Sequence, residues 1–493
     1  MTFLVLLLFL AATPQKFREF FFVDDTRVPA KARESTACEV RAPDASVWTC
    51  AEHGVIRKHA DGSTEHLSGQ RYLPADRVTG IYVESSSRVW FKTAAGFSRV
   101  EYRLMTLEQK ADYFERRIQE RHDHEGFIRS SDHLGRLAPL DNDGLWTAIY
   151  IGAEAFRYAV TKSPEARQRA WRSMDAVIRL EEVTGIPGFP ARAMIRKGEF
   201  RYPEGSWRPS PDGQFEWKSD TSSDELAGQY FAYAVYYDLA ATAAEKPRIR
   251  ATVSRITKHL IEHNYALIDW TGKPTTWAQY STDYLKDHPE ERALNKMLLL
   301  SHLLVAHHIT GDPVFRKEYD KLIGQGYQVD VARYIETRLE INYSDEEMAM
   351  LGFYPLLQYE KDPALRKVYL KGLDEWWENE KREKNPWWIA IHDACIGAKE
   401  NAAEGQWTLE RIPVDLVEYK VENSWRPELH WQKHLDRENH RETMELIPAD
   451  ERRVMKWNGN PFMVDGGGDG KSEDDGSFYL LPYWMGRYMS LWR

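Results

Sequence analysis

The stretch Leu145–Val183, LWTAIYIGAEAFRYAVTKSPEARQRAWRSMDAVIRLEEV, decides the fold class. Its first half is apolar on nearly every side, which is typical of a helix buried in a core. Its second half carries charge on one side only, which is typical of a helix that faces water. Ser163 and Pro164 separate the halves and form a helix-start signal. The stretch therefore predicts a helical hairpin with one buried and one exposed member.

This hairpin pattern returns several times along the chain, with similar turns at Pro247, Asp312-Pro313 and Asp362-Pro363. We expect hairpins over residues 143–184, 222–264, 290–325 and 344–384, and further helices over 105–122, 386–398 and 478–491. Successive hairpins either stack in a line or close into a ring. The inner apolar and outer amphipathic layers predict a mainly α fold, an (α/α)5–6 toroid over residues 104–493. An open helical array is the alternative.

The segment before these helices contains an internal repeat. The pattern V-W-x5-G-x2-R occurs in SVWTCAEHGVIR and again, 42 residues later, in RVWFKTAAGFSR. The second copy, with the preceding LPADRVTGIYVESS, resembles the bacterial two-component-regulator-type propeller repeat. Two repeats cannot close a propeller, which needs roughly four or more blades. We therefore expect a small β region over residues 16–103, a propeller remnant or cap.

The N-terminal sequence MTFLVLLLFLAATPQ has an apolar run followed by small residues, like the middle of a signal peptide, although it lacks a basic start. It predicts a signal peptide over residues 1–15 and a secreted or periplasmic protein, and a buried strand is the alternative. No run is long enough to span a bilayer. Cys38 and Cys50 could pair in an oxidising compartment, which would leave Cys395 unpaired.

The composition narrows the classes of partner. The net charge is −10, and no basic stripe offsets it, which argues against nucleic acid. No metal-binding spacing or cofactor motif occurs, so we expect neither a metal nor a cofactor. The chain has 18 Trp and 25 Tyr, whose flat apolar faces and polar edges suit sugar rings. A carbohydrate is therefore the expected partner.

Acidic clusters precede the apolar helices. They are PLDNDGLW (Asp141, Asp143), SDTSSDEL (Asp220, Asp224, Glu225), NYSDEEMA (Asp345, Glu346, Glu347) and KSEDDGSF (Glu473, Asp474, Asp475). If the inner helices run parallel, these acids gather at one end of the ring. Helix capping explains any single acid, but it needs only one acceptor per helix. We predict that Asp143, with Asp220 or Asp224, supplies the paired carboxylates that glycoside hydrolysis requires.

Further residues suit substrate binding. Arg192 and Arg196 could grip the carboxylate of a uronic acid, because guanidinium groups bind carboxylates through two hydrogen bonds. Tyr280, Tyr343 and His392 are candidates to remove a proton in a lyase reaction. The remaining predicted substrate-binding residues are Trp146, Trp277, Trp457, Asn458 and Trp484.

The hairpin pattern, the inner-helix acids and the aromatic loops of residues 105–493 resemble the α/α-toroid glycan enzymes, the unsaturated glucuronyl hydrolases and several polysaccharide lyases. The resemblance implies a secreted glycoside hydrolase. A uronate-directed lyase and a non-catalytic glycan-binding or sensory module are the alternatives. A terpene enzyme is disfavoured because no DDxxD or DxDD run occurs.

Overall fold

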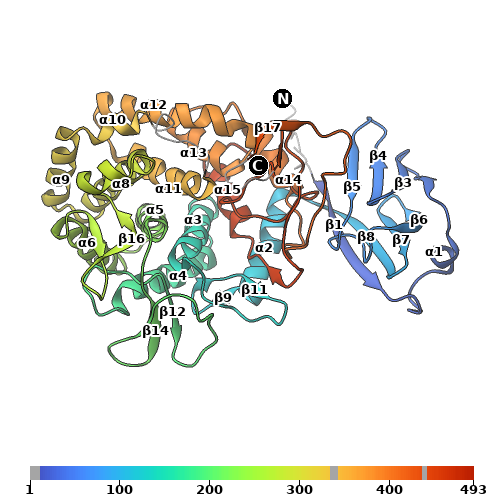
Figure 1. The fold of residues 1–493 in the computed structure, drawn as a ribbon, viewed down its shortest axis with the longest axis horizontal. Helices are drawn as coiled ribbons and strands as arrows, with labels where there is room; N and C mark the ends of the chain where they lie inside the picture. The colour runs from blue at the N-terminus through green and yellow to red at the C-terminus, as the bar shows by residue number, and fades with distance from the viewer. Residues whose placement is uncertain (1–11, 334–341, 436–440, 493) are drawn as a thin grey trace, which may run out of the picture.

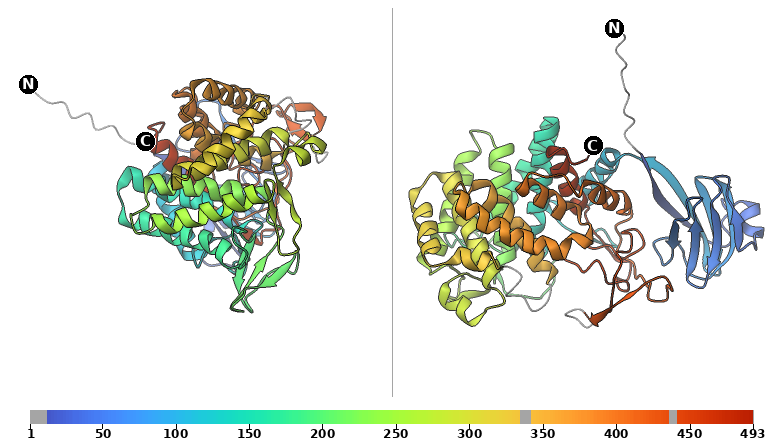
Figure 2. Two further views of the ribbon diagram at one scale, coloured as in Figure 1. Left: turned by 90° about the vertical axis from the view of Figure 1, so that its left-hand side faces the viewer. Right: turned by 90° about the horizontal axis from the view of Figure 1, so that it is seen from above.

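The computed structural model describes residues 12–333, 342–435 and 441–492 (Figure 1). Most of the predicted signal peptide, residues 1–11, lies outside the described residues. Strands fill the region before residue 106, and helices dominate the rest of the chain. The strand region lies at one end of the molecule, beside the C-terminal segment (Figure 2).

Six helices of the described chain form an inner ring. They are α3 (Asp143–Thr161), α5 (Ser223–Leu239), α8 (Arg292–Thr310), α11 (Tyr343–Tyr359), α13 (Pro386–Ile396) and α15 (Ser477–Tyr488). Each packs against the next, and α15 packs against α3, so the ring closes. Most of their residues are buried, because neighbours cover them on both sides and the outer helices cover their backs. The expected toroid is therefore a closed one.

An outer layer covers this ring. Its helices are α2 (Leu107–Arg121), α4 (Pro164–Glu182), α6 (Lys246–Glu262), α9 (Pro313–Gly324), α12 (Pro363–Glu380) and α14 (Ala402–Arg411). Helix α2 packs on α15, so the first and the last long helix of the chain form one pair. The short elements α7 (Thr282–Asp287), α10 (Tyr327–Val331) and η1 (Lys381–Glu383) lie in the connections. The sequence predicted these long helices except α14.

Local signals fix the helix starts and the close contacts. The side chains of Ser163, Asp312 and Asp362 each accept a hydrogen bond from a backbone N–H in the first turn of the helix that follows. Helices α3 and α5 approach closely at two glycines. A Cβ on Gly228 would lie 2.6 Å from the Cα of Leu145, and one on Gly144 would clash with Glu225. Glycine is thus required where these two inner helices meet.

The strand region contains two four-stranded antiparallel sheets that share one core. One sheet has the order β1-β8-β7-β6, formed by Thr13–Phe21, Gly96–Met105, Arg88–Thr93 and Val78–Ser85. The other has the order β2-β3-β4-β5, formed by Glu39–Arg41, Val47–Ala51, Gly54–Lys58 and Thr64–Leu67. The short helix α1 (Ala30–Glu34) packs against β6 and β7. Because β1 begins at Thr13, the last three residues assigned to the leader are part of a sheet.

The sequence repeat forms the same hairpin in each sheet, β3–β4 and β7–β8. Trp48 lies opposite Arg57, and Trp90 lies opposite Arg99, with each guanidinium over its indole at 4.8 and 5.5 Å. The repeat therefore encodes a cross-strand cation–π pair. Each copy contributes a hairpin to a pair of packed sheets, and the kinship with propeller repeats stays a resemblance of sequence.

A disulfide stabilises the strand region internally, and ionic and hydrogen-bond contacts attach it to the toroid. Cys38 and Cys50 form a disulfide within it, and Cys395 is a buried free thiol. Lys16 pairs with Asp450, and the hydroxyl of Tyr72 donates to the backbone carbonyl of Asp450 at 2.9 Å. Charged groups from both regions are buried together at this contact, so the strand region is fixed to the toroid.

Small strand pairs between the helices shape one end of the ring. They are β9 (Asp123–His124) with β10 (Phe127–Ile128), β11 (Ser131–Asp132) with β19 (Ser472–Glu473), β12 (Ala193–Arg196) with β14 (Phe215–Lys218) and β13 (Trp207–Pro209), β15 (Ala266–Ile268) with β16 (Pro274–Gln279), and β17 (Trp431–Leu435) with β18 (Arg441–Thr443). Among the described helices, none is both long and apolar enough to cross a membrane.

Candidate functional site

A cleft with a volume of about 940 Å³ opens at one end of the toroid. The first turns of α5, α8 and α11 form its floor, and hairpin β15–β16, α7 and Arg192 contribute its walls. Asp224 at the start of α5 and Asp345 at the start of α11 both line it. Two of the four predicted acidic clusters, those at the starts of α5 and α11, therefore each contribute an acid to the cleft.

Glu347 is a buried acid of α11 that does not itself line the cleft. It lies in the first two turns of α11, 1% exposed, and its Oε1 has no hydrogen-bond partner among the described residues. Burial, together with the negative charge of Asp224, raises the pKa of Glu347 to about 8, whereas the Lys456 ammonium acts in the opposite direction. At neutral pH, Glu347 is thus mainly protonated, and Asp224 is near enough for its charge to favour that form.

Lys456 brings a positive charge into the same end of the ring. Its ammonium lies 3.3 Å from Asp475 and 3.7 Å from Asp474, and 4.2 Å from the centroid of the Trp146 ring. Both aspartates directly precede α15, and Trp146 is in the first turn of α3. Lys456 therefore neutralises the acids at the start of α15, which do not line the cleft.

Asp143 does not reach the cleft, which corrects its predicted place at the mouth. Its carboxylate and the guanidinium of Arg129 are both fully buried, with contacts of 2.6 Å (Oδ2 to Nη2) and 3.1 Å (Oδ1 to Nε). It also accepts a hydrogen bond from the backbone N–H of Leu140 at 2.9 Å. Because the Arg129 guanidinium compensates the charge of Asp143 through two hydrogen bonds, this carboxylate is not available as a catalytic group.

Asp220 joins two elements beside the cleft rather than lining it. Its backbone has a left-handed φ of 56°, and its carboxylate accepts from the N–H (2.8 Å) and the hydroxyl (3.0 Å) of Thr276. Because Thr276 is in β16, this contact attaches hairpin β15–β16 to the start of α5. Of the three predicted catalytic acids, only Asp224 lines the cleft.

Glu225 also has hydrogen-bond partners that give it a structural role. It is fully buried and accepts from the Gln229 side chain (2.7 Å) and the Gly144 backbone N–H (3.1 Å). Burial raises the pKa of Glu225 to about 8. The bond from Gly144 holds α5 against α3 next to the buried Asp143, and the bond from Gln229 fixes the carboxyl group within α5.

Arg192 and Trp277 are the predicted substrate-binding residues that line the cleft. The Arg192 guanidinium is engaged, because Nη1 donates to the backbone carbonyl of Asp220 at 3.0 Å and Nε lies 3.4 Å from Asp141. Trp277 is 51% exposed, and its indole is open to a ligand.

The other predicted binding residues do not line the cleft. Arg196 pairs with Glu125 on the surface, and Asn458 is exposed elsewhere. The rest are buried in the core, where packing against other aromatic or polar side chains accounts for them: Trp146, Tyr280, Tyr343, His392, Trp457 and Trp484. For example, Tyr343 donates to Asn460, and His392 stacks on Trp377.

The sequence analysis missed the segment between β16 and α8. Its Tyr284, His288, Glu290 and Glu291 all line the cleft. Tyr284 stacks on His288 at 4.2 Å, and its hydroxyl donates to Glu291 at 3.3 Å. The acidic run DHPEER directly before the third hairpin was the available signal.

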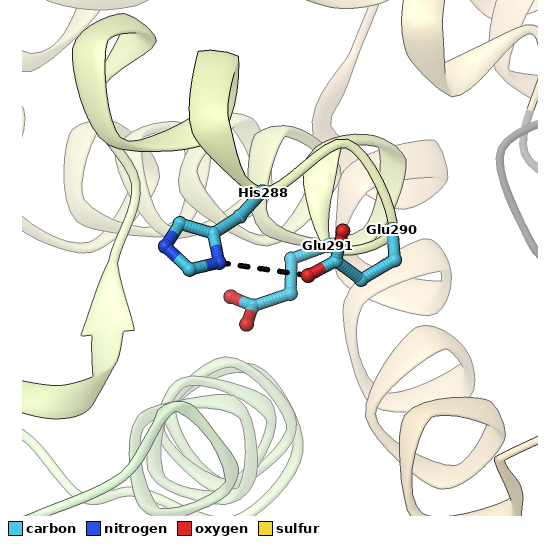
Figure 3. Close-up of side chains that lie close together, drawn as sticks. All are labelled: His288, Glu290 and Glu291. Carbon is cyan, nitrogen blue, oxygen red and sulfur yellow. Dashed lines mark ion pairs between the residues drawn. The ribbon is translucent and has the colours of Figure 1, made fainter.

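This segment also contains a set of possible metal ligands. One ligand atom from each of His288, Glu290 and Glu291 lies within 4.8 Å of the others, and His288 Nδ1 is 3.5 Å from Glu290 (Figure 3). Imidazole and carboxylate groups are ligands for zinc and related ions. Exposed acids often lie together without an ion, so no role is assigned to a metal.

No protein-family model matches the chain, and no curated protein matches it significantly. Three solved structures share a remote likeness. A sugar epimerase from a ruminal bacterium has 12% identity and a TM-score of 0.41, covering 76% of this chain and 97% of its own. A metagenome-derived glycoside hydrolase family 9 endoglucanase has 12% identity and a TM-score of 0.42, covering 98% and 97%.

The third is a family 76 glycoside hydrolase from a bovine Bacteroides thetaiotaomicron strain, with 9% identity and a TM-score of 0.42, covering 97% of this chain and 99% of its own. The site is therefore interpreted from its own residues.

Proposed function

We propose that the protein is a glycoside hydrolase in which Glu347 donates a proton and Asp224 is the second carboxylate. The observation that carries this proposal is that Asp224 lines the cleft while Glu347 is buried near enough for the Asp224 charge to raise its pKa. Glycoside hydrolysis needs one carboxyl group that is neutral at working pH and one that is charged. Glu347 is buried, which favours its neutral form, whereas Asp224 lines the cleft, so their environments suit these two roles.

In this proposal, Glu347 transfers its proton to the glycosidic oxygen as the bond to the anomeric carbon breaks. Asp224 stabilises the positive charge that develops on the sugar and acts on the anomeric carbon, either directly or through a water molecule. Trp277 offers an open indole face on which a sugar ring can stack. Asn295, held by Glu291 at 3.0 Å, lies on the cleft wall beside it.

The lyase alternative has less support. Tyr280, Tyr343 and His392 are buried and, like Glu347, do not line the cleft. Burial raises the pKa of Tyr280 and of Tyr343, which disfavours the form that accepts a proton. The Arg192 guanidinium already lies 3.4 Å from Asp141. The described lining carries the acids Asp224, Glu290, Glu291 and Asp345, which disfavour a uronate by charge repulsion. We therefore favour a glycan without uronic acid at the cleft.

We also infer that the protein is exported. The Cys38–Cys50 disulfide supports this, since structural disulfides persist in oxidising compartments. The apolar N-terminal run of the sequence is consistent with it. Fractionation of cells that express the full chain tests the inference, and a reduced protein in the cytosolic fraction would refute it.

The proposed function is tested by incubating the protein with neutral, amino-sugar and uronate glycans. New reducing ends without ultraviolet absorbance of a conjugated double bond indicate hydrolysis, whereas that absorbance indicates a lyase. Asp224→Asn and Glu347→Gln should each abolish turnover. Asp238→Asn is the matched control, because Asp238 is at the opposite end of α5, where it pairs with His308. Glycan binding without turnover would leave only a binding module.

A further inference from the structure

Three tryptophans that are exposed or half-buried lie on two neighbouring β elements at the cleft. Trp277 in β16 lines the cleft and is 51% exposed, and Trp270, at the turn of the same hairpin, is 43% exposed. Trp207 in the neighbouring strand β13 is half-buried. Trp270 and Trp207 do not line the cleft, so the cleft does not explain why parts of their rings are exposed.

The two elements that carry these rings are attached to each other. Asp220, directly after β14, binds Thr276 in β16, and the hydroxyl of Ser219 donates to Asp269 at 3.3 Å. Trp270 itself contacts Arg208 of β13. Three contacts therefore hold hairpin β15–β16 against the sheet β12-β14-β13, which gives the rings a fixed arrangement.

A guanidinium also holds each of the two outer rings. The carbon of the Arg208 guanidinium lies 3.6 Å from the centroid of Trp270, and that of Arg201 lies 4.8 Å from Trp207. Arg201 is in turn paired with Glu216 of β14 at 2.8 Å. Stacking of this kind restricts the indoles and lowers the entropy that a ligand must remove on binding.

We propose that Trp277, Trp270 and Trp207 form a binding track for a glycan chain several sugar units long that extends out of the cleft. The inference rests on the proposed glycan-active function of the cleft. The track begins inside the cleft at Trp277, so one chain can occupy both. The flat rings are separate and have polar side chains between them. This arrangement suits the alternating faces of a sugar chain better than it suits a partner protein, which would need one contiguous apolar surface.

The track predicts a dependence on chain length. A short oligosaccharide that fills only the cleft reaches Trp277 and gains nothing from Trp270, whereas a longer chain gains a stacking contact on each outer ring. Loss of one such contact weakens binding about 3–10-fold, since an aromatic contact contributes about 0.5–1.5 kcal/mol. The protein should therefore favour long chains through KM, with kcat unchanged.

The test compares Trp270→Ala with the unaltered protein on a polysaccharide and on short oligosaccharides of the same sugar. We expect KM to rise about 3–10-fold for the polysaccharide alone. Phe22→Ala is the control, because Phe22 is a 78% exposed aromatic residue in the strand region. Equal kinetics of Trp270→Ala and the unaltered protein on the long chain would overturn the track, and so would an equal loss on both lengths.

A second measurement separates this inference from the proposed function. Electrophoresis through gels that contain polysaccharide reports binding without turnover. If no glycan is cleaved but a polysaccharide retards the protein and retards Trp270→Ala less, the track stands and the hydrolase proposal falls. If cleavage occurs but Trp270→Ala migrates as the unaltered protein does, the hydrolase stands and the track falls. Absence of both overturns both.

Discussion

The starts of α3 and α5 have nearly the same sequence signature and opposite roles. Asp143 begins α3 and is buried in a bidentate pair with Arg129, whereas Asp224 is in the first turn of α5 and lines the cleft. The two differ in whether a cation from another element reaches them. An acid at a helix start is available for chemistry only where the tertiary structure leaves its charge uncompensated.

Two glutamates sharpen the same comparison. Glu225 and Glu347 are both fully buried, and burial raises the pKa of each to about 8. Glu225 accepts one hydrogen bond within α5 and one from Gly144 of α3, while the Oε1 of Glu347 lacks a partner in the described chain. A buried carboxyl group without a hydrogen-bond partner lowers stability. Its presence next to a cleft is therefore best explained by a function.

The largest expected effect is on turnover. Asp224→Asn should lower kcat about 1,000-fold or more, because the charged carboxylate cannot be replaced by an amide. Circular dichroism and the urea midpoint should stay near those of the unaltered protein. Substantial activity in this variant would show that the cleft uses another acid, and Asp345 would then be the next to replace.

Asp143→Asn should act on stability instead. Breaking a buried ion pair leaves the Arg129 guanidinium uncompensated and costs about 3–5 kcal/mol of unfolding free energy. Urea unfolding measures the loss, with Asp238→Asn as the surface control. A stable Asp143→Asn protein with no activity would reverse the comparison between α3 and α5.

Glu347 should give a pH effect of intermediate size. Its pKa of about 8 in the folded protein exceeds that of an unfolded glutamate, so folding binds a proton and stability falls as pH rises from about 4.5 to about 8. Turnover should decline above pH 8 as the proton donor is lost. Glu347→Gln removes the titrating group and should be more stable than the unaltered protein at pH 9, by about 1–3 kcal/mol.

The matching measurement is urea unfolding of both proteins at pH 5 and pH 9. The difference in unfolding free energy between them should grow with pH. A constant difference would mean that Glu347 is charged throughout this range, which would remove it as the proton donor.

Asp220→Asn should have the smallest effect. The amide oxygen can still accept from the Thr276 N–H, and the amide NH2 can donate to the Thr276 hydroxyl in place of the second acceptor, so the unfolding free energy should drop by about 1 kcal/mol or less. KM should rise a few-fold, because Thr276 and Trp277 shift together on β16. Michaelis kinetics checks this, and a loss as large as that of Asp224→Asn would return Asp220 to the catalytic group.

Much of the fold was readable from the chain. The hairpins on either side of Pro164, Pro313 and Pro363 were predicted within a few residues, because apolar periodicity and capping residues act locally. Helix α14 was missed, since its short AAEGQWTLER stretch has a weak pattern and is stabilised by packing on α13.

The candidate site was less predictable. Asp224 and Trp277 were found from the acids and aromatic residues near helix starts, but so were Asp143, His392 and Trp484, which are buried in the core. Composition does not distinguish an indole that packs inside from one that meets a ligand. The segment with His288 and Glu291 escaped notice because a short acidic turn looks the same in any exposed loop.

The sequence by itself determined the two helix layers and the repeated β-hairpins, because periodicity, capping and cross-strand pairs depend on near neighbours. Only the tertiary structure decided which acids became available. Three other acids are each bound by a residue from elsewhere in the chain: Asp143 by Arg129, Asp475 by Lys456 and Asp220 by Thr276. Such compensation joins residues far apart in the chain, and it leaves Asp224 lining the cleft while its charge acts on the buried Glu347.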